Sequence, residues 1–241
     1  MQKFSKKDKQ NFDKLFKNKE KESEIEKSFY KKTEKYLRFV SWVPWLKMIW
    51  IWNSISMNSA KKDSDIDLFI VSDKNRMWLV RGLVTLIFQV LWVRKTAKNH
   101  AWRFCLSFFC ELEWLDFSNF ALEKDPYLYF WILYFKPILD YDNTYKLFLE
   151  KNSSWADFSD FQDILENNKT YIKYTKNIKK SNNILKKTWD LLNYLFKKIL
   201  LLKTKKHYNK IWKPYGIIIN DKMLKFHDND IRKKVVKNMN I

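Results

Sequence analysis

The segment from residue 53 to residue 71, NSISMNSAKKDSDIDLFIV, constrains the fold most, because a polar loop there runs into an unbroken apolar stretch. The apolar residues at 68–71 predict a buried strand. Asp65 and Asp67 stand at the start of this strand, two residues apart, and therefore point to the same face about 7 Å from each other. Such carboxylates can reach one hard cation, and Mg²⁺ in particular takes oxygen ligands and brings phosphates with it.

A strand whose polar end merely carries two acids is the competing interpretation. The upstream spacing adds information, because Ser64 directly precedes Asp65 and Ser54 lies eleven residues before it. This arrangement resembles the minimal nucleotidyltransferase domain of the DNA polymerase beta superfamily. The pattern of that family is Gly-Ser, a loop, and then Ser-Asp-x-Asp followed by apolar residues.

The resemblance implies a metal-dependent transfer of a nucleoside monophosphate from a nucleoside triphosphate (NTP) to a hydroxyl group. In that family the Gly-Ser turn opens a helix whose N-terminus faces the triphosphate, where backbone N–H groups and the helix dipole favour phosphate. The nucleotide-binding residues implied here are Asn53, Ser54 and Ser64. Asp65 and Asp67 take the catalytic and metal-binding positions, with one or two Mg²⁺ ions that bridge the phosphates.

The chain departs from the family pattern inside the loop. Asn53 stands where the pattern has glycine, an exchange that is tolerable because asparagine adopts positive φ more readily than most residues. Met57 and Asn58 replace the common Arg-Gly pair, which removes one phosphate contact.

The family's third carboxylate, which comes from a later strand, also lacks a clear counterpart. The best later strand, RFCLSFF at residues 103–109, contains no acid. Glu111 and Glu113 follow it, either as a third ligand or as surface acids at a strand end. Two function classes therefore remain open: the transferase, and a catalytically inactive nucleotide- or nucleic-acid-binding protein of the same fold. A third acid within reach of the first two would favour the enzyme, and its absence the binding protein.

Alternating strand and helix patterns predict an α/β (α+β) fold, in which a small mixed sheet is layered with helices and a mainly helical C-terminal part follows. The expected strands lie at 46–52, 66–71, 104–109 and 215–220, and the expected helices at 77–93, at 184–202 and from a cap at Asp228 to residue 239.

Three regions are expected along the chain. Residues 1–35 predict a charged, solvated helical extension, residues 36–125 the nucleotidyltransferase-like domain, and residues 126–241 the mainly helical, basic C-terminal region. The order of segments over residues 36–240 is similar to that of uncharacterised bacterial nucleotidyltransferase-like proteins, which supports the fold more than the reaction.

Charge is concentrated at the C-terminal end. The net charge is +6 over residues 1–38, −2 over 39–168 and +16 over 169–241. Lysines gain affinity for RNA or another polyanion by releasing counterions from phosphates, so the basic region predicts such a partner. With 41 lysines and only 6 arginines, codon bias explains the same charge equally well.

Membrane insertion is not expected. The longest stretch without a charged residue, 82–93, has twelve residues, whereas a spanning helix needs about 20. Peripheral attachment of the lysine-rich end to anionic lipid is an alternative. Cys105 and Cys110 are five residues apart and point to opposite faces of one strand, which disfavours a disulfide and indicates a reducing, cytoplasmic setting.

Glycine is scarce and tryptophan abundant. The chain has 2 glycines and 12 tryptophans, whereas typical usage predicts about 17 glycines. Trp45 and Trp102 stand where a turn favours glycine, which alone adopts positive φ without steric cost. One hypothesis is that some of these positions are UGA codons of a lineage that reads UGA as glycine. The alternative is an AT-rich lineage in which UGA encodes tryptophan.

Overall fold

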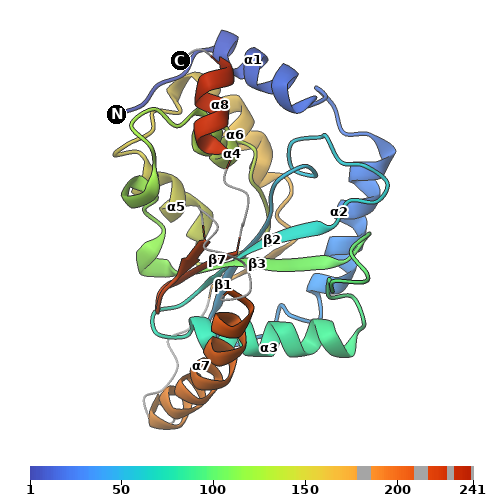
Figure 1. The fold of residues 1–241 in the computed structure, drawn as a ribbon, viewed down its shortest axis with the longest axis vertical. Coiled ribbons are helices and arrows are strands. Elements are labelled where there is room, and N and C mark those ends of the chain that lie inside the picture. Colours follow the sequence, from blue (N-terminus) through green and yellow to red (C-terminus); the bar gives the residue numbers. More distant parts are fainter. Residues whose placement is uncertain (178–185, 209–216, 227–230, 240–241) are drawn as a thin grey trace.

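The computed structural model describes residues 1–177, 186–208, 217–226 and 231–239. Among these residues, strands form one mixed sheet in the order β5-β4-β1-β2-β3-β7-β6, and helices lie on both of its faces (Figure 1). The predicted α/β class with a mixed sheet is confirmed. The strands are β1 (Leu46–Ile51), β2 (Ile66–Ser72), β3 (Phe104–Glu111), β4 (Lys136–Tyr141), β5 (Tyr174–Lys176), β6 (Ile217–Ile219) and β7 (Met223–Phe226).

The helices divide between the two faces of the sheet, and each face has its own apolar core. Successive residues of β1 alternate between the cores, with Trp50 in the first and Ile49 in the second. The first core also receives α1 (Lys6–Phe16), α4 (Pro126–Leu133), α5 (Thr144–Asn152), α6 (Gln162–Lys169) and α8 (Arg232–Met239). The second receives α2 (Glu24–Leu37), α3 (Met77–Val90) and α7 (Lys186–Tyr208).

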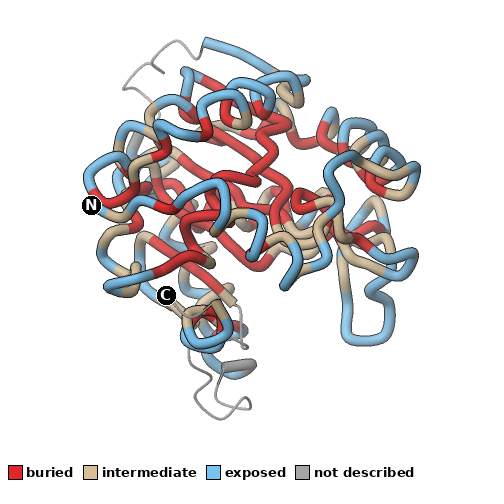
Figure 2. Tube along the Cα trace, turned by 90° about the horizontal axis from the view of Figure 1, so that it is seen from above, coloured by how far each residue is buried: buried red, intermediate tan, exposed pale blue. Residues whose placement is uncertain are grey.

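Strand register places the acidic motif at one edge of the sheet. β1 and β2 are antiparallel, with Ile51 opposite Leu68. β2 and β3 are parallel, with Asp67 opposite Cys105. The end of β1 therefore meets the beginnings of β2 and β3. Figure 2 shows that the buried segments run through the centre of the molecule, with exposed loops around them.

The N-terminal residues differ from the single solvated helix that was expected. They form two helices, and α1 ends at Phe16, followed by the capping residue Lys17, whose φ of 57° is left-handed. Phe12 and Phe29 are fully buried, and the Phe12 ring packs on Phe130 of α4 with centroids 4.9 Å apart. Phe12 of α1 and Phe29 of α2 thus enter the cores on opposite faces of the sheet, so neither helix is simply solvated.

Residues 126–241 contribute strands as well as helices. β4 lies between β5 and β1 and is buried along its whole length. A short apolar run of this kind has no period that separates a strand from a buried helix, which explains why the sequence indicated helix there. The helix expected at 184–202 is α7 and the late strand is β6. Residues 215, 216 and 228 lie outside the described residues, and α8 ends at Met239 as expected.

Three tryptophans have left-handed backbones. Trp45 and Trp102 have φ of 60° and 61°, which confirms that they occupy turn positions favourable to glycine, and Trp92 has φ of 56°. The Trp102 ring stacks on Phe29 with centroids 4.0 Å apart. Both cysteines are free. Within the described residues, none of the helices has the length and apolarity that a membrane span requires.

Candidate metal and nucleotide site

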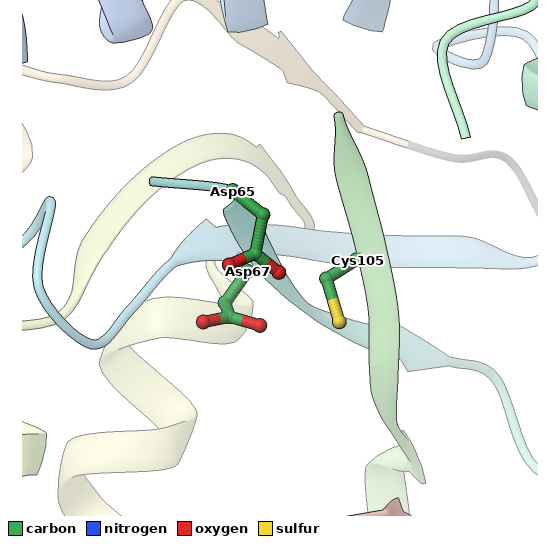
Figure 3. A group of neighbouring side chains, drawn as sticks. All are labelled: Asp65, Asp67 and Cys105. Atoms are coloured by element: carbon green, nitrogen blue, oxygen red, sulfur yellow. The ribbon is translucent and has the colours of Figure 1, made fainter. Parts of the chain in front are cut away.

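Asp65, Asp67 and Cys105 converge at the edge where β2 and β3 begin. Asp65 directly precedes β2, Asp67 is the second residue of β2, and Cys105 is the second residue of β3. One ligand atom from each lies within 4.8 Å of the others, and Figure 3 shows the three side chains gathered around one point. The spacing of the two aspartates therefore produces the shared face that the sequence predicted.

Asn53 links the turn after β1 to Asp67. Its φ of 61° is left-handed, which is the conformation that glycine would adopt at this position. Its side-chain Nδ2 donates to Asp67 Oδ2 at 2.8 Å, and its Oδ1 accepts from Trp131 Nε1 at 3.2 Å. Asparagine thus supplies the backbone shape of glycine and also fixes the orientation of one carboxylate.

Ser54 lies in a turn, whereas the resemblance implies that it lies at the start of a helix. Residues 53–58, all described, form turns with Met57 N–H donating to the Asn53 carbonyl at 3.1 Å, and they do not form a helix. Asn58 has φ of 54°, which stops helical propagation. Among the described residues, the Ser54 hydroxyl has no hydrogen-bond partner. The turn therefore offers a hydroxyl and a few amides to an anion without the dipole of a long helix.

Ser64 supports the loop before the acidic motif. Its Oγ accepts from the Lys61 backbone N–H at 2.9 Å, and its carbonyl accepts from Trp102 N–H at 2.8 Å. These bonds fix the chain direction as it enters β2. A contact between Ser64 and a nucleotide stays a prediction.

The site is electrostatically strained. Burial, followed by the charge of Asp65, raises the pKa of Asp67 from 3.8 to about 6. Lys95 Nζ forms an ion pair with Asp65 Oδ2 at 2.6 Å. Burial lowers the pKa of Lys95, but its bond to Asp65 and the neighbouring Cys105 and Asp67 raise it overall. A cation at this place is therefore stabilised by the protein, and Lys95 supplies one.

Neither proposed third carboxylate reaches the site. Glu111 is the last residue of β3, opposite Ser72, and is therefore about 20 Å of extended strand away from Cys105. It is buried and pairs with Lys222 at 2.9 Å, while Glu113 pairs with Lys74 at 2.6 Å. Both acids are structural ion-pair partners. Glu111 also differs from the expected surface acid, because β7 and Lys222 cover it.

The donor set matches Mg²⁺ only in part. Lys95 and Asn53 bind the Oδ2 atoms of Asp65 and Asp67, respectively, and the Cys105 thiol also hydrogen-bonds to Asp67. Carboxylate oxygens of this kind are ligands that Mg²⁺ prefers. The third group within reach is the Cys105 thiol, a soft ligand that Mg²⁺ does not favour. Two of the three groups therefore suit magnesium.

Sequence patterns did not indicate Lys95 or the role of Cys105. Cys105 was assessed only for a disulfide, although it is the second residue of the strand predicted next after the acidic one. Parallel pairing of these two strands is the signal that would have placed it opposite Asp67. Lys95 comes from the segment between α3 and β3, and no local pattern around it indicates a site.

A second polar feature lies on the face that carries α1. A cleft of about 960 Å³ is lined by lysines of the N-terminal region and reaches Ser56 and Asn58 of the loop after Ser54. Lys136 of β4 lines it, and burial lowers the pKa of this lysine to about 8. Its Nζ donates to Asn168 Oδ1 at 2.7 Å.

Comparisons of the chain with protein-family models, curated proteins and solved structures gave no match. The resemblance to nucleotidyltransferases therefore stays a prediction that rests on residues 53–71 and on the site they form.

Proposed function

We propose that this protein binds an NTP together with a divalent cation at Asp65 and Asp67. The observation that carries the proposal is the meeting of both carboxylates with the left-handed turn at Asn53 and Ser54. Carboxylates hold a hard cation, and the hydroxyl and backbone amides of a turn can bind phosphate oxygens. A metal-bound triphosphate needs both kinds of group side by side.

In this proposal each side chain has a defined task. Asp65 and Asp67 hold the cation, which would neutralise phosphate charge and align an attacking hydroxyl. Asn53 keeps the Asp67 carboxylate turned toward the site, and Ser54 donates its hydroxyl to a phosphate oxygen. Lys95 balances the two carboxylates when no cation is bound and attracts the anionic ligand.

With Mg²⁺ as the cation, the geometry supports nucleotide binding better than nucleotidyl transfer. A transferase active site usually places a third carboxylate next to the first two, and here, among the described residues, that place holds a thiol. The turn at Ser54 also lacks the helix that would strengthen phosphate binding. Nucleotidyl transfer to a hydroxyl of RNA, protein or a small molecule is the second candidate, favoured by the paired aspartates.

Equilibrium binding of labelled ATP, CTP, GTP and UTP with and without Mg²⁺ tests the proposal. We expect cation-dependent binding that Asp65→Asn abolishes. Asp63→Asn is the matched control, since Asp63 is an exposed acid in the same loop. Nucleotide binding that is insensitive both to Mg²⁺ and to Asp65→Asn would overturn the proposal. Incubation of the labelled NTPs with total cellular RNA or protein then separates transfer from binding alone.

A polyanion such as RNA remains a proposed partner, with a cytoplasmic location where NTPs and reduced thiols occur. The described basic residues of α7 and α8 do not share one surface, however, because these two helices belong to opposite faces of the sheet (Figure 1). Lysine-to-glutamine changes on one helix at a time tell which face binds. The log–log salt slope of RNA binding should fall by about 0.7 per lost phosphate contact on that face. The exposed lysines to compare are Lys198, Lys203 and Lys206 of α7 with Lys233, Lys234 and Lys237 of α8.

A further inference from the structure

We infer that Cys105 is the third ligand of the Asp65–Asp67 site, and that the site therefore prefers a borderline cation such as Co²⁺ or Zn²⁺ over Mg²⁺. The inference deepens the proposed function, since it names the class of cation that accompanies the nucleotide. Its own evidence is the position of the thiol.

The position of Cys105 is fixed by strand pairing. Asp67 and Cys105 are register partners in the parallel pair of β2 and β3, so their side chains start from neighbouring backbone positions on one face. Their ligand atoms and that of Asp65 lie within 4.8 Å of one another (Figure 3). Ligand atoms around a tetrahedral Zn²⁺ are about 3.5 Å apart, given bond lengths of about 2.0–2.3 Å. Small side-chain rotations are enough to close the difference.

A second observation is the polar environment of the thiol. The Ser107 side chain is buried, with 7% exposure, and its hydroxyl has no hydrogen-bond partner among the described residues. The Cys105 thiol is the group that it interacts with, in a contact that falls short of normal hydrogen-bond geometry. A buried hydroxyl without a partner is costly unless something else satisfies it. A thiolate that is bound to a metal accepts such a hydrogen bond, which would also orient the sulfur.

The chemistry of the donor set follows from hard and soft preferences. Thiolate selects borderline and soft ions, whereas carboxylate and water suit Mg²⁺. Binding breaks the S–H bond of Cys105 and forms a sulfur–metal bond, and the proton passes to the buffer without oxidation or reduction. The coordinated thiolate brings the charge of the ligand set to that of three carboxylates.

Lys95 competes with a metal ion for the carboxylate of Asp65. Its ammonium contacts Asp65 Oδ2 at 2.6 Å, while its side chain is 39% exposed. The ammonium group can therefore move into solvent when a metal ion binds, because its side chain already contacts water. Lys95 and Asn53 occupy one oxygen of Asp65 and one of Asp67, respectively. The Cys105 thiol, which also hydrogen-bonds to Asp67, becomes a ligand itself when it loses its proton.

Titration of the intact protein with Co²⁺ alone tests the inference, because cobalt bound to thiolate gives a charge-transfer absorption band. We expect the band in the original protein and in Cys110→Ala. It should be lost in Cys105→Ala, with a more than tenfold weaker affinity, because even changes to residues that only hydrogen-bond to metal ligands cost about 10- to 100-fold. Cys110 is the matched control, since it is the other free cysteine and is buried away from the site.

Cys105→Asp gives the converse test. It should abolish the cobalt–sulfur band and raise Mg²⁺ affinity by about tenfold or more, because three carboxylates then face the ion. A band that survives Cys105→Ala, or Mg²⁺ binding at least as tight as Co²⁺ binding in the original protein, would overturn the inference. A different result would refute the proposed nucleotide binding: Co²⁺ would bind through sulfur, but NTP would not bind with any cation.

Discussion

Asp67 and Cys105 lie opposite each other across the parallel strands β2 and β3, and burial raises the pKa of both side chains. Two ionisable groups are thus held side by side where β2 and β3 begin, and burial disfavours the charged form of each. Such a local conflict between stability and residue choice is expected at functional sites. It also makes the role of Asp67 measurable through stability.

Replacing Asp67 with Asn should stabilise the protein at neutral pH. The folded-state pKa of about 6 lies above the ordinary value of 3.8, so the folded protein gains from Asp67 only while that group is protonated. This contribution is complete below about pH 4 and is lost as the pH rises to about 6. Asp67→Asn removes the penalty, which is worth roughly 1–3 kcal/mol at pH 7. Urea unfolding at pH 7 and pH 4 should show a gain that disappears at the lower pH.

The matched variant Asp63→Asn should change the unfolding free energy at pH 7 by less than about 0.5 kcal/mol, as surface substitutions do. A destabilised Asp67→Asn protein at pH 7 would contradict the strained-site interpretation.

Ser54 should contribute to phosphate binding through its unpartnered hydroxyl. Ser54→Ala removes one charge-assisted hydrogen bond, worth about 1.5–3 kcal/mol, and should weaken NTP binding by roughly ten- to a hundredfold. Ser59→Ala is the internal control. The Ser59 hydroxyl already donates a hydrogen bond to the Ser54 carbonyl at 3.3 Å, so it is engaged within the loop. Equal behaviour of the two variants in a nucleotide titration would show that the turn at Asn53 and Ser54 does not bind phosphate.

Lys136 should make stability depend on pH in the alkaline range. Burial lowers its pKa from 10.5 to about 8 in the folded protein, so its charge destabilises the fold below pH 8. That penalty is relieved as the pH rises toward 10.5. The unfolding free energy of the original protein relative to Lys136→Met should therefore increase by roughly 1–2 kcal/mol between pH 7.5 and 9.5.

The difference between these two proteins cancels the titration of tyrosines and cysteines, which both share. Lys173→Met is the matched control, since Lys173 is an exposed lysine that follows α6. A difference between the original protein and Lys136→Met that is constant over this range would contradict the burial of a charged Lys136.

Trp45, Trp92 and Trp102 give the genetic-code hypothesis its sharpest test. All three adopt left-handed φ between 56° and 61°, a conformation that is a genuine outlier for a bulky residue. If UGA is read as glycine in the source organism, peptide mass spectrometry of the native protein will find glycine at these three positions. Tryptophan at all three would leave AT-rich tryptophan usage as the explanation.

Local patterns predicted the part of the site that lies within one strand. Asp65 and Asp67 share a face because the period of a strand is two, and this needs no knowledge of the partner strands. Cys105 and Lys95 became visible only through the pairing of β2 with β3 and the course of the chain between them. β4 was missed for a related reason, because its apolar run has no period of its own and only its neighbours make it a strand.

Reciprocal calorimetric titrations measure whether NTP and a divalent cation bind together at Asp65 and Asp67. NTP affinity is measured with and without saturating Co²⁺ or Mg²⁺, and cation affinity with and without NTP. Linked binding requires the same factor of enhancement in both directions. We predict a factor of at least about tenfold that falls to one in Asp67→Asn and is unchanged in Asp63→Asn. Independent binding of nucleotide and cation, or the same enhancement in Asp67→Asn, would contradict the account.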